Sequence, residues 1–227
     1  MSKYHFNDTE DNNDYPDHVL EALEKIEDLK LEGKHKESIE MAEGLLCEDP
    51  DCVAALEEIA DNYVSLESFK SAEKAALHAL KLDKDSYIAH YILGFIHSHH
   101  QDWENALDEL TVSNKIHPNN AEILRCLGWA MFNSKKRTQG IVILERSLSL
   151  DADNSLTLCD LGVCYLQTKD FEKSIHLLQK AMEIDPSNER VQECYRAAKN
   201  FSDRYSILTK NEPRKTTKKT PYRRSFI

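Results

Sequence analysis

A period of 34 residues runs through most of this chain of 227 residues. Prolines recur at twice that interval and glycines recur at the interval itself. The members of the two series are Pro50, Pro118 and Pro186, and Gly94, Gly128 and Gly162. A fixed period of this length predicts a stack of similar supersecondary units, in which each unit packs only against its neighbours.

Each period reads as two helices joined by a turn. In residues 155–188, Leu158, Leu161 and Tyr165 recur at spacings of three and four, as on one face of a helix. After a polar break, a second apolar face begins at Phe171, and Pro186 ends it because proline cannot extend a helix. With only six glycines and six prolines, the composition also favours an all-α fold.

A second series of small residues marks the place where the two helices of a unit cross. Glycine inside a helix costs about 0.5–1 kcal/mol relative to alanine, so the three periodic glycines need a packing reason. The facing positions of the second helices are also small or nearly so: Ser38, Ala72, Ala106, Gly140 and Ser174. We therefore expect close helix contact between the two series.

The residues that recur at the 34-residue period resemble those of the tetratricopeptide-repeat family. The resemblance covers residues 19–188 and is strongest in two units, which carry Leu93-Gly94, Trp103, Ala106 and Pro118, and Leu161-Gly162, Tyr165, Phe171, Ala181 and Pro186. It implies a right-handed α-solenoid of about five 34-residue helix-turn-helix units. The expected units are 19–52, 53–86, 87–120, 121–154 and 155–188, followed by a capping helix over 189–208.

The solenoid is expected to occupy residues 18–208 between two arms of opposite charge. Residues 1–17 carry five acids and one lysine and are predicted to be a disordered acidic arm. Residues 209–227 are predicted to be a disordered basic tail. Residues 210–227 have a net charge of +6, whereas the rest of the chain has −17. The candidate tail contacts are Lys210, Arg214, Lys215, Lys218, Lys219, Arg223 and Arg224.

Motifs for catalysis or cofactor binding are absent from the sequence. No G-x-x-x-x-G-K, G-x-G-x-x-G, G-x-S-x-G or H-E-x-x-H occurs, so we predict a non-enzymatic protein with no catalytic residues, cofactor or small-molecule substrate. His97 and His100 lie one helical turn apart and could chelate a metal. However, His97 occupies the repeat position that holds Tyr63, Met131 and Tyr165 in other units, which is a packing position, so no metal site is predicted. The six cysteines form no C-x-x-C pair and are expected to be reduced and mostly structural.

The first helices of the units are expected to line a concave groove. Acidic residues gather in the early units, whereas aromatic and apolar residues follow in the later ones. Phe95 and Trp129 are expected to anchor a peptide, and Arg125 to pair with a carboxylate on it. The full candidate site is Tyr91, Phe95, Arg125, Trp129, Phe132, Val163 and Leu166. The alternative is that these side chains pack against neighbouring helices and leave no exposed strip.

The predicted function is a protein-interaction scaffold or adaptor that binds an extended or helical peptide segment in this groove. Some members of the family clamp acidic C-termini with lysine and asparagine. This chain departs from that pattern, with Phe95, Trp129 and Val163 at the asparagine positions and Glu57 and Tyr91 at the lysine positions. Two alternatives remain: a cytosolic chaperone for an exported client, and an adaptor tethered to nucleic acid or ribosomes through the basic tail.

The expected compartment is the cytoplasm. The first residues lack the basic and apolar pattern of an export signal, and no apolar run approaches the roughly 20 residues that span a bilayer. We therefore predict no membrane span. The expected partners are an unidentified protein or peptide in the groove and a weak anionic partner of the tail.

Overall fold

The computed structural model describes residues 15–211, with side chains to residue 206, and these residues form eleven helices and no strand. The helices are α1 (Asp17–Leu31), α2 (His35–Glu48), α3 (Val53–Ser65), α4 (Phe69–Leu82), α5 (Tyr87–His99), α6 (Trp103–Ile116), α7 (Ala121–Asn133), α8 (Arg137–Leu150), α9 (Ser155–Gln167), α10 (Phe171–Ile184) and α11 (Glu189–Asn211). The prediction of an all-α fold built from helix pairs is confirmed.

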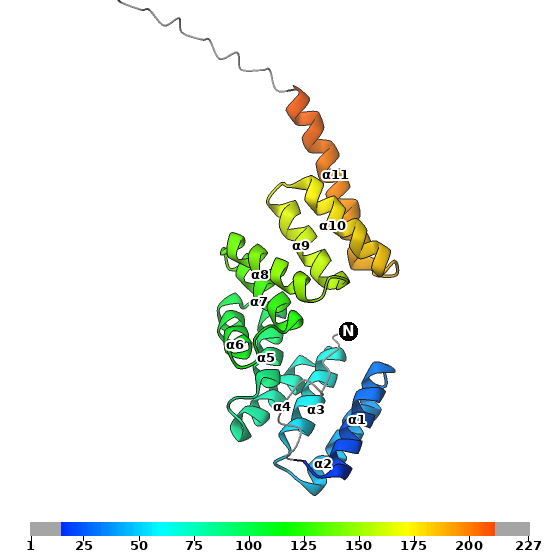
Figure 1. Ribbon diagram of the computed structural model, residues 1–227, viewed down its shortest axis with the longest axis vertical. Helices are drawn as coiled ribbons and strands as arrows, with labels where there is room; N and C mark the ends of the chain where they lie inside the picture. The colour runs from blue at the N-terminus through cyan, green and yellow to red at the C-terminus, as the bar shows by residue number, and fades with distance from the viewer. Residues whose placement is uncertain (1–14, 212–227) are drawn as a thin grey trace, which may run out of the picture.

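The pairs stack one after another from α1 and α2 at one end to α11 at the other (Figure 1). The first helices of successive units contact one another, in the pairs α1 with α3, α3 with α5, α5 with α7, and α7 with α9. These helices and α11, which contacts α9, form the inner layer of the solenoid, whereas the second helices form the outer layer. Inner-layer side chains are therefore the ones that converge on a shared surface.

The turn between the two helices of each unit contains one residue with positive φ, and these residues are also 34 apart. They are Gly33 (φ 76°), Glu67 (55°), Gln101 (60°), Lys135 (72°) and Lys169 (66°). Only the first is a glycine, although L-residues pay a steric cost in this left-handed region. The same backbone turn therefore recurs in all five units whatever residue occupies it.

The two helices of a unit touch where the small columns face each other. A Cβ on Gly94 would lie 2.5 Å from Leu110 Cγ, and a Cβ on Gly140 would lie 2.6 Å from the carbonyl oxygen of Gly128. In the fifth unit the Ser174 hydroxyl donates a hydrogen bond of 2.7 Å to the Gly162 carbonyl oxygen. Close crossing thus explains why larger residues are excluded from these positions.

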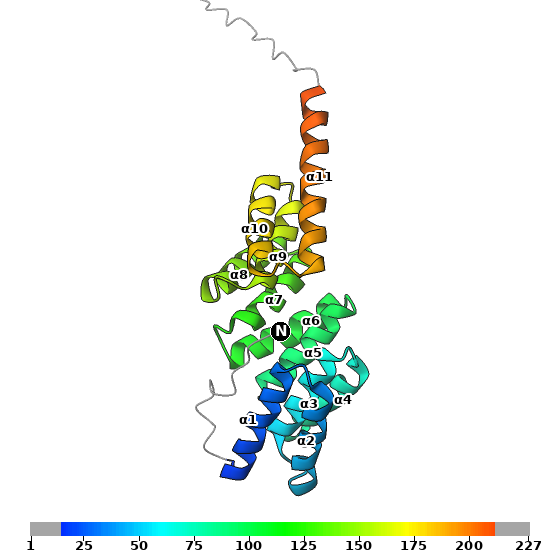
Figure 2. The ribbon, with the colours of Figure 1, turned by 90° about the vertical axis from the view of Figure 1, so that its right-hand side faces the viewer.

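The capping helix α11 is longer than the helices of the repeats. It packs Val191 and Ala198, both fully buried, against α9 and α10. Further along, Phe201 and Tyr205 are exposed, and Figure 2 shows the end of the helix projecting beyond α9 and α10. The first half of the helix covers the apolar end of the fifth unit, and in the second half the Tyr205 ring lies 5.2 Å from the Phe171 ring of α10.

Candidate binding groove on the inner helices

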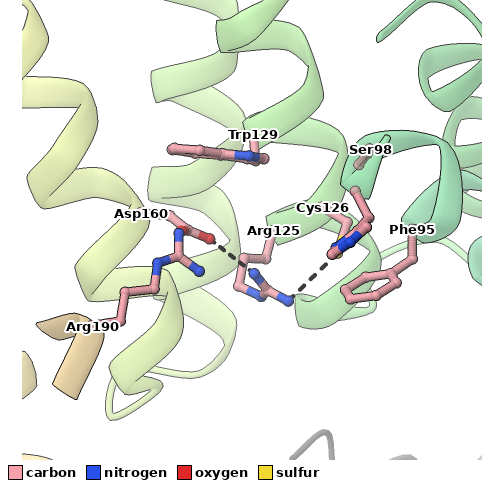
Figure 3. A pocket seen from close by; sticks show the side chains of 8 residues that line it. Phe95, Ser98, Arg125, Cys126, Trp129, Asp160 and Arg190 are labelled. Atoms are coloured by element: carbon pink, nitrogen blue, oxygen red, sulfur yellow. Dashed lines mark hydrogen bonds and ion pairs between the residues drawn. The ribbon is translucent and has the colours of Figure 1, made fainter. Parts of the chain in front are cut away.

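A pocket of about 170 Å³ lies on the inner layer at the junction of the third, fourth and fifth units. Figure 3 shows Phe95 and Ser98 on one side, Asp160 and Arg190 on the other, and Arg125 between them. The lining residues are Phe95, Ser98 and His99 from α5, Arg125, Cys126 and Trp129 from α7, Asp160 from α9 and Arg190 from α11. Four inner-layer helices thus contribute to one site.

The walls of the pocket combine aromatic faces with one unsatisfied polar group. Phe95 and Trp129 are half-buried, and the Arg190 guanidinium lies over the Trp129 ring at 5.9 Å from its centroid. The Ser98 hydroxyl oxygen is buried and has no hydrogen-bond partner among the described residues. A buried hydroxyl without a partner costs free energy, which a ligand group or a water would offset.

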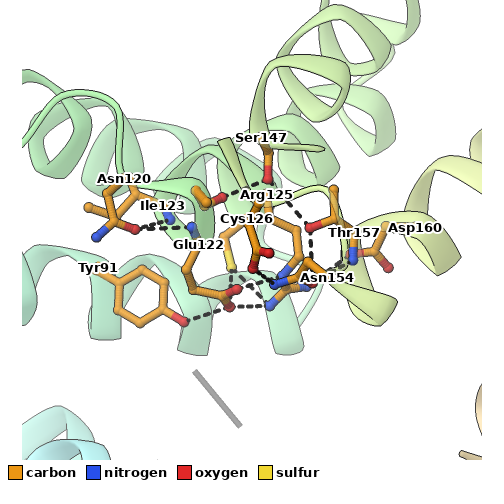
Figure 4. Close-up of polar contacts among 12 residues, drawn as sticks. Tyr91, Asn120, Glu122, Ile123, Arg125, Cys126, Ser147, Asn154, Thr157 and Asp160 are labelled. Carbon is orange, nitrogen blue, oxygen red and sulfur yellow. Dashed lines mark hydrogen bonds and ion pairs between the residues drawn. The ribbon is translucent and has the colours of Figure 1, made fainter. Parts of the chain in front are cut away.

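The floor of the pocket is a chain of charges of alternating sign, buried except at Arg190. Arg125 donates from Nε to Glu122 Oε2 at 2.9 Å and from Nη1 to Asp160 Oδ2 at 2.9 Å (Figure 4). Arg190 Nη2 donates to the other Asp160 oxygen at 2.9 Å, and the Tyr91 hydroxyl donates to Glu122 at 3.1 Å. Helices α5, α7, α9 and α11 are therefore linked by one polar network.

Charge pairing decides the ionisation of this network. Burial alone would raise the pKa of Glu122, but the adjacent Arg125 outweighs it and holds that pKa below its usual value. Burial alone would lower the pKa of Arg125, but Cys126, Glu122 and Asp160 outweigh it and hold that pKa well above its ordinary value. Both groups are therefore charged at neutral pH.

The structure separates the seven predicted groove residues into two sets. Phe95, Trp129, Val163 and Leu166 are partly open, and the first two line the pocket. The other three, Tyr91, Arg125 and Phe132, are 6%, 9% and 2% exposed. Phe132 packs with Leu144 and Leu161, and the donors of Arg125 are engaged by Glu122 and Asp160 of its own chain. Arg190 is the more exposed cation of the pocket.

Sequence reasoning missed Ser98, Glu122, Asp160 and Arg190 as members of this site. One signal was available: the positions one period before and after Asp160 hold Cys126 and Cys194, so a charge buried at this position requires a partner. Arg125 lies one repeat plus one residue earlier and is that partner. Arg190 lies in the segment expected to form the capping helix, outside the repeat positions from which the groove was predicted.

The early part of the inner layer is polar and acidic. Lys30 Nζ contacts Glu58 at 2.9 Å and Asp61 at 3.1 Å. Glu57 accepts a hydrogen bond of 2.5 Å from the Ser86 hydroxyl, and burial raises the pKa of Glu57 to about 7. Carboxylates therefore outnumber cations in the early half of the inner face, whereas the later half combines aromatic rings with paired charges.

The histidine pattern is accounted for by local contacts. His97 Nδ1 lies 3.7 Å from Asp102 Oδ2, and the His99 ring lies 4.2 Å from the Phe69 ring. Within residues 15–211 no group of three or more His, Cys, Asp or Glu side chains is arranged to hold a metal ion. In that same range no helix has the length and apolarity needed to cross a membrane. The predicted tail contacts between Lys210 and Arg224 lie outside the described side chains.

Comparison with known proteins agrees with the geometry. The sequence profile of the family described as Tetratricopeptide repeat matches residues 155–188. The fold is similar to that of TTC0263, a thermophilic TPR protein of Thermus thermophilus, with a TM-score of 0.66 and 18% identity over 79% of this chain and 97% of the other. The chain thus carries a match to the tetratricopeptide repeat at residues 155–188 and has the fold of tetratricopeptide-repeat proteins.

Other tetratricopeptide-repeat structures and longer relatives are also similar. YrrB, described as a TPR protein with an unusual peptide-binding site, has a TM-score of 0.55 and 18% identity over 77% of this chain and 90% of its own. BBSome complex member BBS4 of Bos taurus is 24% identical over 160 residues, which are 70% of this chain and 30% of that protein. The chain spans less than half the length of the curated relatives it matches.

Proposed function

We propose that this protein is a non-enzymatic interaction scaffold that binds an extended or helical peptide of a partner on the inner face, with an apolar side chain seated between Phe95 and Trp129. The observation that carries the proposal is the pocket between these rings, which four inner-layer helices build together. The fold supports protein binding in general, since stacked helix pairs present a long surface to a partner.

The chemistry of the pocket defines the peptide it would accept. Two half-buried aromatic rings favour an aliphatic or aromatic side chain, because large apolar contacts in partly enclosed sites concentrate binding energy. The unpartnered Ser98 hydroxyl favours a backbone carbonyl or amide of the same peptide. YrrB, which has a similar fold and is described by its peptide-binding site, supports this class of ligand.

The test starts from peptides selected from a random library against the full chain. Isothermal titration calorimetry measures the affinity of the parent and of each variant for a selected peptide, because a fluorescence signal from Trp129 would be lost in Trp129→Ala. Replacing a central aromatic anchor costs about 2 kcal/mol or more, so Trp129→Ala should weaken binding by at least about 30-fold. Val142→Ala, on the outer helix α8 where Val142 is exposed, is the matched control and should bind as the parent does.

Equal binding by the parent and Trp129→Ala would refute the proposed groove. Deleting residues 210–227 separates it from the alternative of a basic-tail adaptor. Binding in the groove should survive that deletion, whereas an association that disappears with the tail and weakens steeply with salt would indicate an anionic partner.

A further inference from the structure

Two cysteines face each other where the capping helix meets the fifth unit. Cys159 on α9 is 1% exposed, and Cys194 on α11 is half-buried. Both belong to one apolar cluster with Leu178, Val191 and Ala198. Each thiol alters the pKa of the other through a side-chain interaction, so the two side chains lie next to each other.

An ion pair fixes the two helices beside these thiols. Asp160 directly follows Cys159, and Arg190 lies one helical turn before Cys194. Arg190 Nη2 and Asp160 Oδ1 are 2.9 Å apart, and the Asp160 side chain is 2% exposed. The pair therefore holds α11 against α9 in the register that brings the thiols together.

The surroundings give the two thiols different properties. The hydrogen bond from Cys159 and the positive charge of Arg190 lower the pKa of Cys194 to about 7, although burial opposes them. The bond with Cys194 and burial raise the pKa of Cys159. Cys194 thus resembles the accessible thiolate, and Cys159 the resolving thiol, of a peroxide-sensitive pair.

The other buried cysteines lack this arrangement. Burial raises the pKa of Cys52, of Cys164 and, to about 12, of Cys126. Cys47 is exposed on α2, at the opposite end of the solenoid. Exposure alone would therefore make Cys47 the first thiol to be oxidised, whereas the local environment favours Cys194.

We propose that Cys194 and Cys159 form a reversible disulfide when a hydroperoxide oxidises the protein, and that this bond fastens α11 to the fifth unit. The Cys194 thiolate attacks the peroxide, forming cysteine sulfenic acid and, with a proton from water, releasing an alcohol or water. The Cys159 sulfur then displaces the sulfenic oxygen as water, and an S–S bond forms. Two thiols are oxidised and one hydroperoxide is reduced.

The bond would act at the edge of the proposed groove. Cys159 is next to Asp160, and Cys194 is one turn from Arg190, so the disulfide closes the same helix contact as the ion pair at the pocket wall. A dithiol can reverse the bond by exchange through a mixed disulfide. The junction between α9 and α11 would therefore be held by apolar packing and the ion pair in the reduced form, and by a covalent bond as well in the oxidised form.

The test uses the full reduced chain treated with stoichiometric hydrogen peroxide, quenched with a thiol-alkylating reagent and digested without reduction. We expect a linked peptide containing Cys159 and Cys194, two hydrogens lighter than the separate peptides and released by dithiothreitol. It should appear before oxidation of Cys47. Cys164→Ser, which removes a buried thiol from the same helix as Cys159, is the matched control and should leave the linkage unchanged.

Two further variants assign the roles of the pair. Cys159→Ser should stop at the sulfenic acid of Cys194, which dimedone traps as an adduct. Cys194→Ser should give no linkage and no adduct on Cys159. Circular dichroism confirms that each variant is folded before treatment. Absence of the linked peptide while Cys47 is oxidised, or dimedone on Cys159 instead of Cys194, would overturn the proposal.

Discussion

The inner layer contains two buried charge clusters that differ in balance. In the early units, one cation, Lys30, faces two carboxylates, Glu58 and Asp61, while the neighbouring Glu57 is hydrogen-bonded to a hydroxyl. In the later units, Glu122, Arg125, Asp160 and Arg190 alternate in sign. The first cluster has surplus negative charge, whereas the second is neutral.

The pKa values of one carboxyl group from each cluster report this difference. Glu57 and Glu122 are both buried, yet burial raises the pKa of Glu57 to about 7, whereas Arg125 holds that of Glu122 below its usual value. Burial therefore does not by itself decide the ionisation of a carboxyl group. The presence of a cation of matching geometry does.

Replacing the central cation of each cluster should give the largest difference in the free energy of unfolding between the two clusters. Arg125→Met leaves Glu122 and the almost fully buried Asp160 without their shared partner, and we expect it to lower the free energy of unfolding by about 3–5 kcal/mol. Lys30→Met should cost about 2 kcal/mol, because Asp61 is more exposed and Glu58 can take up a proton. Urea unfolding followed by circular dichroism at pH 7 gives both values. Equal losses of unfolding free energy in the two variants would show that the two clusters do not differ in this way.

Glycine substitutions compare the helix packing of the same two regions. Gly140→Ala places a Cβ 2.6 Å from the Gly128 carbonyl oxygen and from the Phe132 amide, so we expect a loss of about 1–3 kcal/mol. Gly44→Ala lies on an exposed part of α2 with nothing within 4 Å, so it should gain about 0.5–1 kcal/mol from helix propensity. Thermal melting of the two variants and the parent should show a lower melting temperature for Gly140→Ala and a higher one for Gly44→Ala.

The pH dependence of stability should differ in sign between the two glutamates. Below about pH 4.5, Glu57 is protonated in both folded and unfolded chains, so its raised pKa has no effect. As pH rises through 7, the folded state must ionise this buried group and stability is lost. Glu57→Gln should therefore stabilise the protein by about 1–2 kcal/mol at pH 8, and by less toward pH 5.

Glu122→Gln supplies the opposite case. The lowered pKa of Glu122 stabilises the folded state above the unfolded pKa, and this contribution is lost as pH falls through the folded value. The variant should therefore be less stable than the parent at pH 8, with a smaller gap in acid. Unfolding curves at pH 5 and pH 8 for both variants give the test, and parallel pH profiles would contradict it.

Substitutions in the turns between paired helices should have the smallest effect on stability. Gly33 and Lys135 occupy the same left-handed position in the first and fourth units. Lys135→Gly should stabilise the protein by about 0.5 kcal/mol because it relieves steric cost, while Gly33→Lys should destabilise it by a similar amount. Melting temperatures of the exchanged pair are the measurement. A change of the same sign in both would show that the two turns are not equivalent.

The positions of the helices could be predicted from the repeat period, because each helix ends where polar or proline residues interrupt a regular apolar face. Helices α9 and α10 lie where Leu158, Leu161 and Phe171 place them. The shared turn was hidden, because Glu67, Gln101, Lys135 and Lys169 carry no glycine signal. Its conformation is set by the two packed helices that it joins rather than by the residue within it.

The groove was predicted less completely than the fold for a physical reason. The columns placed Phe95, Arg125 and Trp129 on inner helices, as observed. They did not show that Arg125 is paired within the chain, because its partner Asp160 comes from the next unit. Contacts between units join residues about one period apart, and a single repeat read alone does not display them.

The junction between α8 and α9 has a mechanical consequence. Among helices adjacent in sequence, this pair makes the least extensive contact, whereas α7 and α8 make the most. The fourth unit is thus the most tightly packed helix pair, and its junction with the fifth unit has the least contact between helices adjacent in sequence, so we expect bending to concentrate there. The ion pair between Arg125 on α7 and Asp160 on α9 connects the fourth and fifth units across this junction, so it limits how far the solenoid can bend there.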